Sequence, residues 1–347
     1  AGLLSNRAMK LILTVDTEAD SQWDAGAKLT TANLDYVPRF QELCEQFEFP
    51  PTYLCTHEVI TSPVFDRTLA KPTRSGYAEV GTHLHPWSTP PFDSTWDDAE
   101  RAHPYPSELP TELLQSKLKT LTETLGDRLG EAPTSYRAGR WGFSTTQVSL
   151  LESLGYLVDC SVTPFVSWVR HRGLQMGGPD FTNAPIFPYS LSKHDMCCAG
   201  SSGLLEVPVT IVHANQMMRR SALLRRWFRH YASWSARAGD RFFRLAPQWF
   251  RPFPHMSAER LIAVYETASA LGMPAVEMML HSSELMPGGS PDNPTPAAVN
   301  NLFHQLKRTF SHLTDRGVEG VTLTAFAQSY LSTDPKQVRR NDESESP

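Results

Sequence analysis

The feature that most constrains the fold is a repeated alternation of short strand-like segments with longer amphipathic ones. The strand-like segments occupy residues 11–15, 52–56, 79–81, 134–137, 156–159, 204–212, 275–280 and 318–324. Apolar residues recur at helical spacing in segments 33–47, 59–69, 109–129, 145–154, 257–271, 296–316 and 325–331. Strands that alternate with helices are typical of parallel sheets, so the sequence predicts an α/β fold.

Composition narrows the class of protein further. The chain has 347 residues, 40% of them hydrophobic, which is enough for one large core. Its net charge of −5 gives no basic bias, so we expect no nucleic-acid partner. The five cysteines are scattered and form no C-x-x-C motif, which argues against a disulfide scaffold and favours a reducing, cytoplasmic location. No apolar run is long enough to span a membrane, and residues 1–10 lack the apolar region of a signal peptide.

The chain is expected to form a single domain with one interruption. We predict one barrel domain over residues 9–332, with an irregular or helical insertion rich in arginine and aromatic residues at about 166–255. Residues 333–347 are charged and poor in apolar side chains, which predicts a disordered tail.

Polar residues gather where the predicted strands end. In extended backbone, residues i and i+2 face the same side, so a pair at that spacing can reach one point. The groups are Asp16 and Glu18, His83 and His85, Arg137 and Arg140, Asp159, and His281 and Glu284. Active sites of parallel α/β folds lie at the carboxyl edge of the sheet, so we expect these side chains to meet there.

The first two of these pairs have alternative interpretations. His83 and His85 lie at a strand end or in the loop beyond it, where neutral imidazoles are common metal ligands, although two ligands do not define a metal. They could instead be unrelated polar residues of a loop. Asp16 and Glu18 could bind a metal or catalyse, because a carboxylate at the end of a buried strand needs a partner, or they could cap the next loop.

The arginines also allow two interpretations. Arg137 and Arg140 flank a glycine turn and could orient a carboxylate or bind an anion, or they could simply be exposed. Segment 219–251 holds nine arginines, one acidic residue and interleaved aromatics. It could contact a membrane surface or cradle an anionic glycan or lipid head group. Alternatively, its aromatics pack on the barrel and its arginines face solvent.

The order of these motifs resembles the polysaccharide deacetylase family, the NodB-homology group with a distorted (β/α)7 barrel. The resemblance covers about residues 11–331 without 166–255, and the matching stretches are 15–18, 79–85, 136–142, 159–164 and 280–284. The chain departs from the family pattern at two points. The usual adjacent Asp-Asp is replaced by Asp16-Thr-Glu18, and the second histidine stands at position 85, whereas the family spacing would place it at Trp87. These departures are those of a divergent branch.

The resemblance implies a metal-dependent hydrolase that removes an acetyl group from an N-acetylated sugar in a glycan or glycolipid. Asp16, His83 and His85 would bind a divalent metal, and nitrogen and oxygen ligands favour Zn²⁺. The metal would polarise the acyl carbonyl and acidify a bound water.

The resemblance also implies roles for the remaining polar residues. A carboxylate of the first motif, Glu18 or its neighbouring aspartate, would act as the base, and His281 would protonate the leaving amine. Arg137 or Arg140 would orient the base, and Asp159 would hold His281 or an arginine.

Two other functions remain open from the sequence. The missing second aspartate fits a barrel that has lost catalysis and binds a glycan or lipid carrier through aromatic and arginine side chains. The other is a metal-dependent hydrolase acting on a non-sugar C–N bond, since barrels related to this family are expected to host such chemistry.

Overall fold

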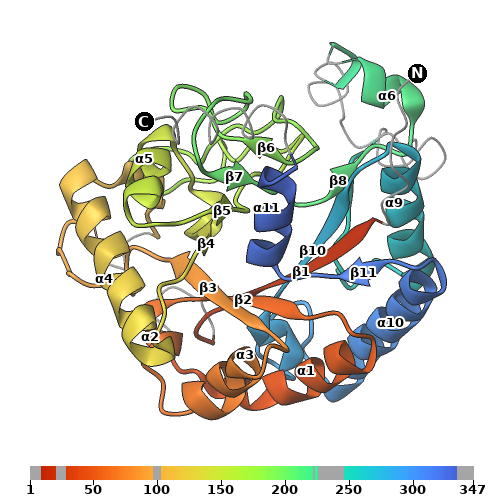
Figure 1. Ribbon diagram of the computed structural model, residues 1–347, viewed down its shortest axis with the longest axis horizontal. Coiled ribbons are helices and arrows are strands. Elements are labelled where there is room, and N and C mark those ends of the chain that lie inside the picture. The colour runs from red at the N-terminus through yellow and green to blue at the C-terminus, as the bar shows by residue number, and fades with distance from the viewer. Residues whose placement is uncertain (1–8, 21–28, 97–102, 222, 226–245, 334–347) are drawn as a thin grey trace, which may run out of the picture.

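The protein forms a curved parallel sheet surrounded by helices (Figure 1). The computed structural model describes residues 9–20, 29–96, 103–221, 223–225 and 246–333. Among the described residues, seven parallel strands form the main path of the sheet, in the spatial order β10 (Ala275–His281), β1 (Lys10–Thr17), β2 (Pro51–Cys55), β3 (Glu79–Leu84), β4 (Ser135–Ala138), β5 (Val158–Asp159) and β7 (Leu205–Glu206). The predicted α/β fold with a distorted (β/α)7 barrel is confirmed.

Two contacts bring the ends of this sheet together. After β7, the Thr210 backbone N–H donates to the Glu277 carbonyl of β10 (3.3 Å), and the Glu277 N–H donates to Thr210 Oγ1 (2.8 Å). The smaller strands lie outside this path: β6 (Tyr189–Ser190) is antiparallel to β7, β11 (Glu319–Gly320) is parallel to β1, and β8 (Ile211–Val212) is antiparallel to β9 (Gln248–Trp249).

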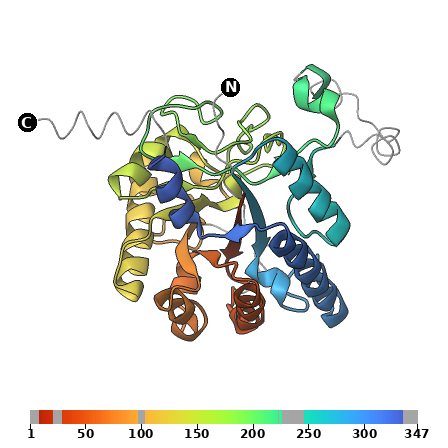
Figure 2. The ribbon, with the colours of Figure 1, turned by 45° about the vertical axis from the view of Figure 1, so that its right-hand side comes forward.

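Helices form the outer layer, as Figure 2 shows. The helical segments of the described residues are η1 (Ala32–Tyr36), α1 (Val37–Gln46), α2 (His57–Ile60), η2 (Asp66–Ala70), α3 (Lys71–Arg74), η3 (Pro106–Glu108), α4 (Thr111–Leu129), η4 (Gly139–Trp141), α5 (Thr145–Ser153), α6 (Gln216–Arg220), α9 (Ala258–Ala270), η5 (Ser282–Leu285), α10 (Pro296–Asp315) and α11 (Leu323–Leu331). Among the described residues no helix is both long enough and apolar enough to cross a membrane.

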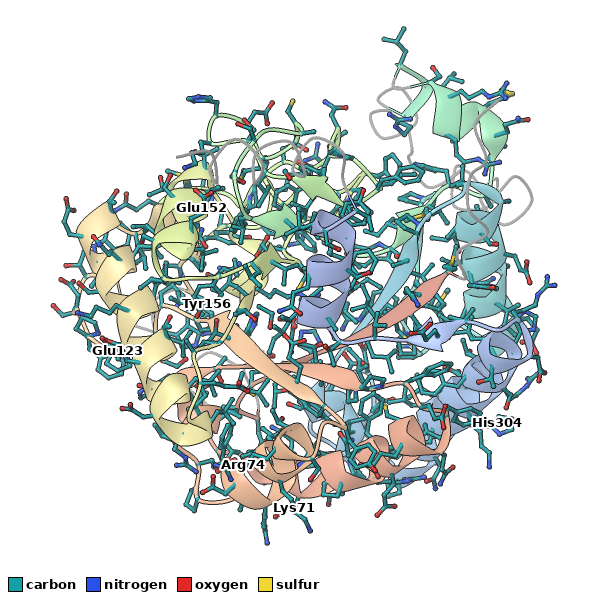
Figure 3. The ribbon with its side chains drawn as sticks, viewed as in Figure 1. Lys71, Arg74, Glu123, Glu152, Tyr156 and His304 are labelled. Atoms are coloured by element: carbon teal, nitrogen blue, oxygen red, sulfur yellow. The ribbon has the colours of Figure 1, made fainter. Side chains whose placement is uncertain are left out.

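Local sequence explains where these elements begin and pack. Thr295 caps α10 by accepting a hydrogen bond from the Ala298 N–H, and Pro296 occupies the first turn, where its missing N–H costs nothing. The strand β1 is buried from Leu11 to Thr17, as expected for a strand covered on both faces. The Tyr156 hydroxyl, labelled in Figure 3, lies between Thr82 of β3 (2.9 Å) and Thr122 of α4 (2.8 Å) and joins the two layers.

Three predicted segments differ from the structure. The predicted strand at 318–324 is wrong in its second half, because Thr322 caps α11 and ends the extended backbone. The predicted strand at 204–212 is divided into β7 and β8 around Pro208, which has no N–H to donate. The predicted strand at 79–81 is longer than expected, since β3 continues to Leu84 and includes His83.

Within residues 166–255, β7 belongs to the barrel sheet, and loops with β6, β8, β9 and α6 surround it. In Figures 1 and 2, α6 stands away from the barrel. Most of the arginine-rich segment 219–251, and the predicted tail after Thr333, lie outside the described residues.

Candidate metal centre and catalytic pocket

Three buried side chains converge at the carboxyl edge of the sheet. The Nε2 atoms of His83 and His85 are 2.9 Å apart, and Glu18 Oε2 lies 3.2 Å from His85 Nε2 and 3.7 Å from His83 Nε2. Ligands bound about 2.0–2.1 Å from a tetrahedral zinc ion lie roughly 3.3 Å from one another. The donor set and its spacing therefore fit a small divalent cation.

The protonation of the histidines suits a metal as well. His83 Nδ1 lies 3.0 Å from the Arg137 carbonyl, which can only accept, so Nδ1 carries the proton and the Nε2 lone pair faces the cluster. Burial lowers the pKa of His83 to about 4, and burial together with the neighbouring His83 holds the pKa of His85 well below its usual value. Both imidazoles are consequently neutral near pH 7, which is the form that binds metals.

Burial also acts on Glu18. It raises the pKa of this carboxyl well above its usual value, and the negative charges of Asp16 and Glu58 raise it further. A buried carboxylate in such surroundings is costly unless a cation balances it. The burial and the negative surroundings of Glu18 thus favour a bound cation, as the spacing of the three side chains also does.

The strand register and one glycine hold the histidines in place. His83 on β3 pairs with Arg137 on β4, so the two residues share one level of the sheet. Gly139 follows β4 and lies directly against the His85 ring and the Leu84 carbonyl, where a Cβ atom would clash with both. Only glycine lets the turn after β4 approach His85 this closely.

Asp16 belongs to a second network, centred on the fully buried Arg137. The Arg137 guanidinium donates from Nη1 to Asp16 Oδ1 (2.5 Å), and from Nη2 to Glu277 Oε1 (2.7 Å) and Thr14 Oγ1 (2.9 Å). Its Nε donates to the Cys160 carbonyl (2.9 Å). Burial acts to raise the pKa of Asp16, but the charge and hydrogen bond of Arg137, together with the neighbouring His83 and His281, hold that pKa below its usual value. Asp16 is therefore ionised and fixed in position.

His281 is held from the side opposite Asp16. Its Nδ1 lies 2.9 Å from Glu284 Oε1, and Arg251 Nη2 donates to the same oxygen (2.7 Å). Burial would raise the pKa of Glu284, but Arg251 and His281 lower it to about 2. The imidazole Nε2 lies 3.9 Å from Asp16 Oδ2 and 4.0 Å from Glu18 Oε1. Glu284 thus orients His281 with Nε2 toward the two carboxylates.

These groups open into one pocket of about 500 Å³. Its lining comprises Asp16, Glu18, His83, His85, Trp87, His103, Tyr105, Ala138, Arg140, Trp141, Trp168, His171, Arg251, His281, Ser290, Pro291 and Asp292. The volume is that of a small-molecule site, and the mixture of aromatic and polar side chains is typical of such sites.

Asp159 lies apart from this lining. It accepts hydrogen bonds from the Ser161 N–H (3.0 Å) and hydroxyl (2.7 Å) and is in contact with the carboxyl group of Glu206. Burial raises the pKa of both carboxyls, and Asp159 raises that of Glu206 further. In the structure, the hydrogen-bond partners of Asp159 are a carboxyl group and a serine, and the positive charge of Arg137 also acts on its carboxyl group.

The structure brings together most of the residues that the sequence suggests and adds two. Arg137 lies directly behind Asp16, and Arg140 lines the pocket from the turn that follows β4. Glu277 and Arg251 were not predicted from the sequence as site residues. The sequence does contain an indication of a role for Glu277, since it is the single charged residue in an apolar strand. For Arg251 the sequence gives no such indication beyond its place in an arginine-rich segment.

Similar folds occur among solved structures. A protein from Parabacteroides distasonis, assigned as a glycoside hydrolase/deacetylase, aligns with a TM-score of 0.62 and 11% identity over 96% of this chain and 74% of its own. The 4-alpha-glucanotransferase from Thermococcus litoralis aligns with a TM-score of 0.53 and 11% identity over 95% of this chain and 41% of its own. A protein from Mycobacterium smegmatis, assigned as a polysaccharide deacetylase, aligns with a TM-score of 0.48 and 15% identity over 93% of this chain and 97% of its own.

Comparisons of sequence give no match. No protein-family model matches the chain, and no curated protein has a significantly similar sequence. The first two structural alignments show the fold alone, because their identities are low. They confirm the barrel fold that the resemblance to polysaccharide deacetylases implies.

Proposed function

We propose that the protein is a metal-dependent hydrolase that removes the acetyl group from an N-acetylated sugar, in a glycan or a glycolipid. The observation that carries this proposal is the convergence of Glu18, His83 and His85 on one point, with Asp16 and His281 facing the same pocket. A metal ligand set beside a carboxylate and an oriented imidazole is suited to the hydrolysis of an amide.

In this proposal Glu18 joins the two histidines as a metal ligand, in place of Asp16. The Glu18 oxygen is within 3.7 Å of both Nε2 atoms, whereas Asp16 Oδ1 is engaged by Arg137. Neutral imidazoles and a carboxylate suit Zn²⁺. When bound, the ion would polarise the acyl oxygen and make a water more acidic.

The protein's own residues would then move the protons. Asp16, kept ionised by Arg137, would accept the proton of the attacking water. His281, whose Nδ1 is held by Glu284, would deliver a proton from Nε2 to the leaving nitrogen. Trp87, Trp141 and Trp168 line the pocket and offer apolar faces to a sugar ring.

The test is acetate release from a panel of N-acetylated mono- and oligosaccharides by the zinc-loaded protein. His281→Gln should lower the rate by roughly 10²–10⁴-fold, the usual contribution of a general acid. His304→Gln is the matched control, because His304 is exposed on α10 (Figure 3), and it should leave the rate unchanged. Metal binding without acetate release from any sugar would reject the proposed substrate and favour a non-sugar amide.

A further inference from the structure

The turn that follows β4 has an unusual backbone. Arg140 and Trp141 both adopt positive φ angles, 53° and 61°, although neither is glycine. A non-glycine residue in this left-handed region costs free energy. Such residues persist where the surrounding structure holds them in place, and they are common at functional sites. Gly139, directly before them, lies against the His85 ring. The strained turn thus adjoins the candidate metal ligands.

This backbone carries the Arg140 side chain to the pocket wall. The guanidinium donates to the carbonyls of His103 and Arg172 (2.9 Å for the second) and lies 4.2 Å above the Tyr105 ring. These contacts use backbone oxygens and an aromatic face, so they hold the group in place without neutralising it. Arg140 is half-buried and lines the pocket.

The other two arginines of the site are balanced by acids. Arg137 contacts Asp16 and Glu277, and Arg251 contacts Glu284. Within the part of the chain that the structure describes, no carboxylate lies within ion-pair distance of Arg140. Asp292 also lines the pocket, but it makes no ion pair with Arg140. A guanidinium that is held in a pocket, and that no carboxylate of the described residues neutralises, is suited to a carboxylate or a phosphate of a ligand.

We propose that Arg140 binds an anionic group of the substrate, so that the preferred substrate is an N-acylated sugar bearing a carboxylate or a phosphate. This inference rests on the proposed deacetylase function and specifies its substrate class. Trp141 and Trp168 extend the same wall, with ring centroids 6.3 Å apart and planes inclined by 19°. The sugar ring would lie along these faces while its acidic group meets Arg140.

The test measures binding rather than turnover, so that it does not depend on catalysis. Calorimetry would use the zinc-loaded His281→Gln protein with N-acetylglucosamine and N-acetylglucosaminuronic acid, which differ only in a hydroxymethyl against a carboxylate group. N-acetylglucosamine 6-phosphate is the third ligand and distinguishes carboxylate from phosphate recognition. A charge-assisted pair should make the preferred anionic ligand bind roughly 10–100-fold more tightly than the neutral sugar.

Variants then assign the preference to Arg140. When Arg140→Gln is added to the His281→Gln protein, the ratio of its affinity for the anionic sugar to that for the neutral sugar should fall to near one. Arg140→Lys should retain part of this ratio. Tyr105→Phe is the structural control, because it removes the hydroxyl bond to the His171 carbonyl (2.8 Å) that ties the same wall together. It should change the affinities for charged and neutral ligands alike and preserve their ratio.

Two results would overturn the inference. One is equal affinity of the Arg140-containing protein for the neutral and both charged sugars. The other is a preference for the charged sugar that survives Arg140→Gln. Failure of the deacetylase function itself is seen separately, as absence of acetate release by the protein with His281 intact despite tight sugar binding.

Discussion

Asp16 and His281 occupy paired positions on the adjacent parallel strands β1 and β10, and His281 Nε2 lies 3.9 Å from Asp16 Oδ2. The register thus places the proposed base beside the proposed proton donor. A shift of either strand by one residue would turn one of the two side chains to the other face of the sheet. The proposed catalytic arrangement consequently depends on the core that fixes β1 against β10.

Replacing Arg137 with methionine should destabilise the protein strongly. The change strands the buried carboxylates of Asp16 and Glu277, and removal of one partner from a buried ion pair costs about 3–5 kcal/mol in the free energy of unfolding. Urea unfolding measures this loss. Glu319→Gln is the control, since its pair with Lys10 is exposed and worth at most about 1 kcal/mol.

A second variant keeps the Arg137 prediction testable if the single variant does not fold. Adding Glu277→Gln to Arg137→Met removes one of the two stranded charges and should recover part of the stability. If Arg137→Met is as stable as the wild type, the ion pairs of Arg137 do not stabilise the folded protein.

Replacing Glu284 with glutamine should impair catalysis more than folding. The variant keeps the size of the side chain but loses the charge that orients His281 Nδ1 and pairs with Arg251. We expect kcat for acetate release to fall by roughly 10–100-fold with little change in KM, the size of effect seen when a partner that positions a site residue is removed. An unchanged kcat would show that Glu284 does not position His281.

The pair of Asp159 and Glu206 predicts a dependence of stability on pH. The folded pKa of Glu206 is raised, so the stability that its protonated form contributes is complete below the unfolded pKa near 4.5 and declines as pH rises toward the folded pKa. Glu206→Gln lacks this decline. The free energy of unfolding of the variant minus that of the wild type should therefore increase from pH 4.5 to pH 8.

Urea unfolding at several pH values measures this difference. Glu152→Gln, which affects a carboxylate near the surface paired with Lys193, serves as the control. A difference that stays constant over the range for Glu206→Gln would mean that this carboxyl does not hold its proton in the folded state.

Gly173 should not tolerate a side chain. The Glu108 carboxylate accepts hydrogen bonds from the backbone N–H groups of Gln175 (2.8 Å) and Met176 (2.7 Å), and a Cβ atom on Gly173 would clash with it. Gly173→Ala should cost about 1–3 kcal/mol in the free energy of unfolding, as overpacking does. Gly203→Ala is the matched control, because its Cβ would make only an ordinary contact, 3.5 Å from Glu152. Thermal unfolding would compare the stabilities of the two variants. An equal loss of stability in both would show that Glu108 does not exclude a side chain at Gly173.

The sequence predicts the strands of the barrel well because their buried character is local. Leu11 to Val15 is an apolar run whatever its neighbours, and the spacing of His83 and His85 indicates a shared target. The role of Glu18 depends on where three strands end relative to one another, which no local pattern reports. Arg251 reaches Glu284 from a distant loop, and only the tertiary fold brings the two together.

Asp159 shows what a sequence motif does not determine. Its position at a strand end matched the family motif, yet β5 has only two residues, and the carboxyl faces Glu206 and Ser161. The sequence places a residue at the edge of the sheet but does not determine the direction of its side chain.

The most direct test of the proposed metal centre is the metal content of the purified protein, measured by elemental analysis for the wild type and for His83→Ala/His85→Ala. The exposed His304→Ala serves as the matched control. We predict about one zinc ion per chain in the wild type and the control, and loss of the ion in the double variant. Equal metal in all three proteins, or none in the wild type after supplementation with zinc, would contradict the site formed by Glu18, His83 and His85.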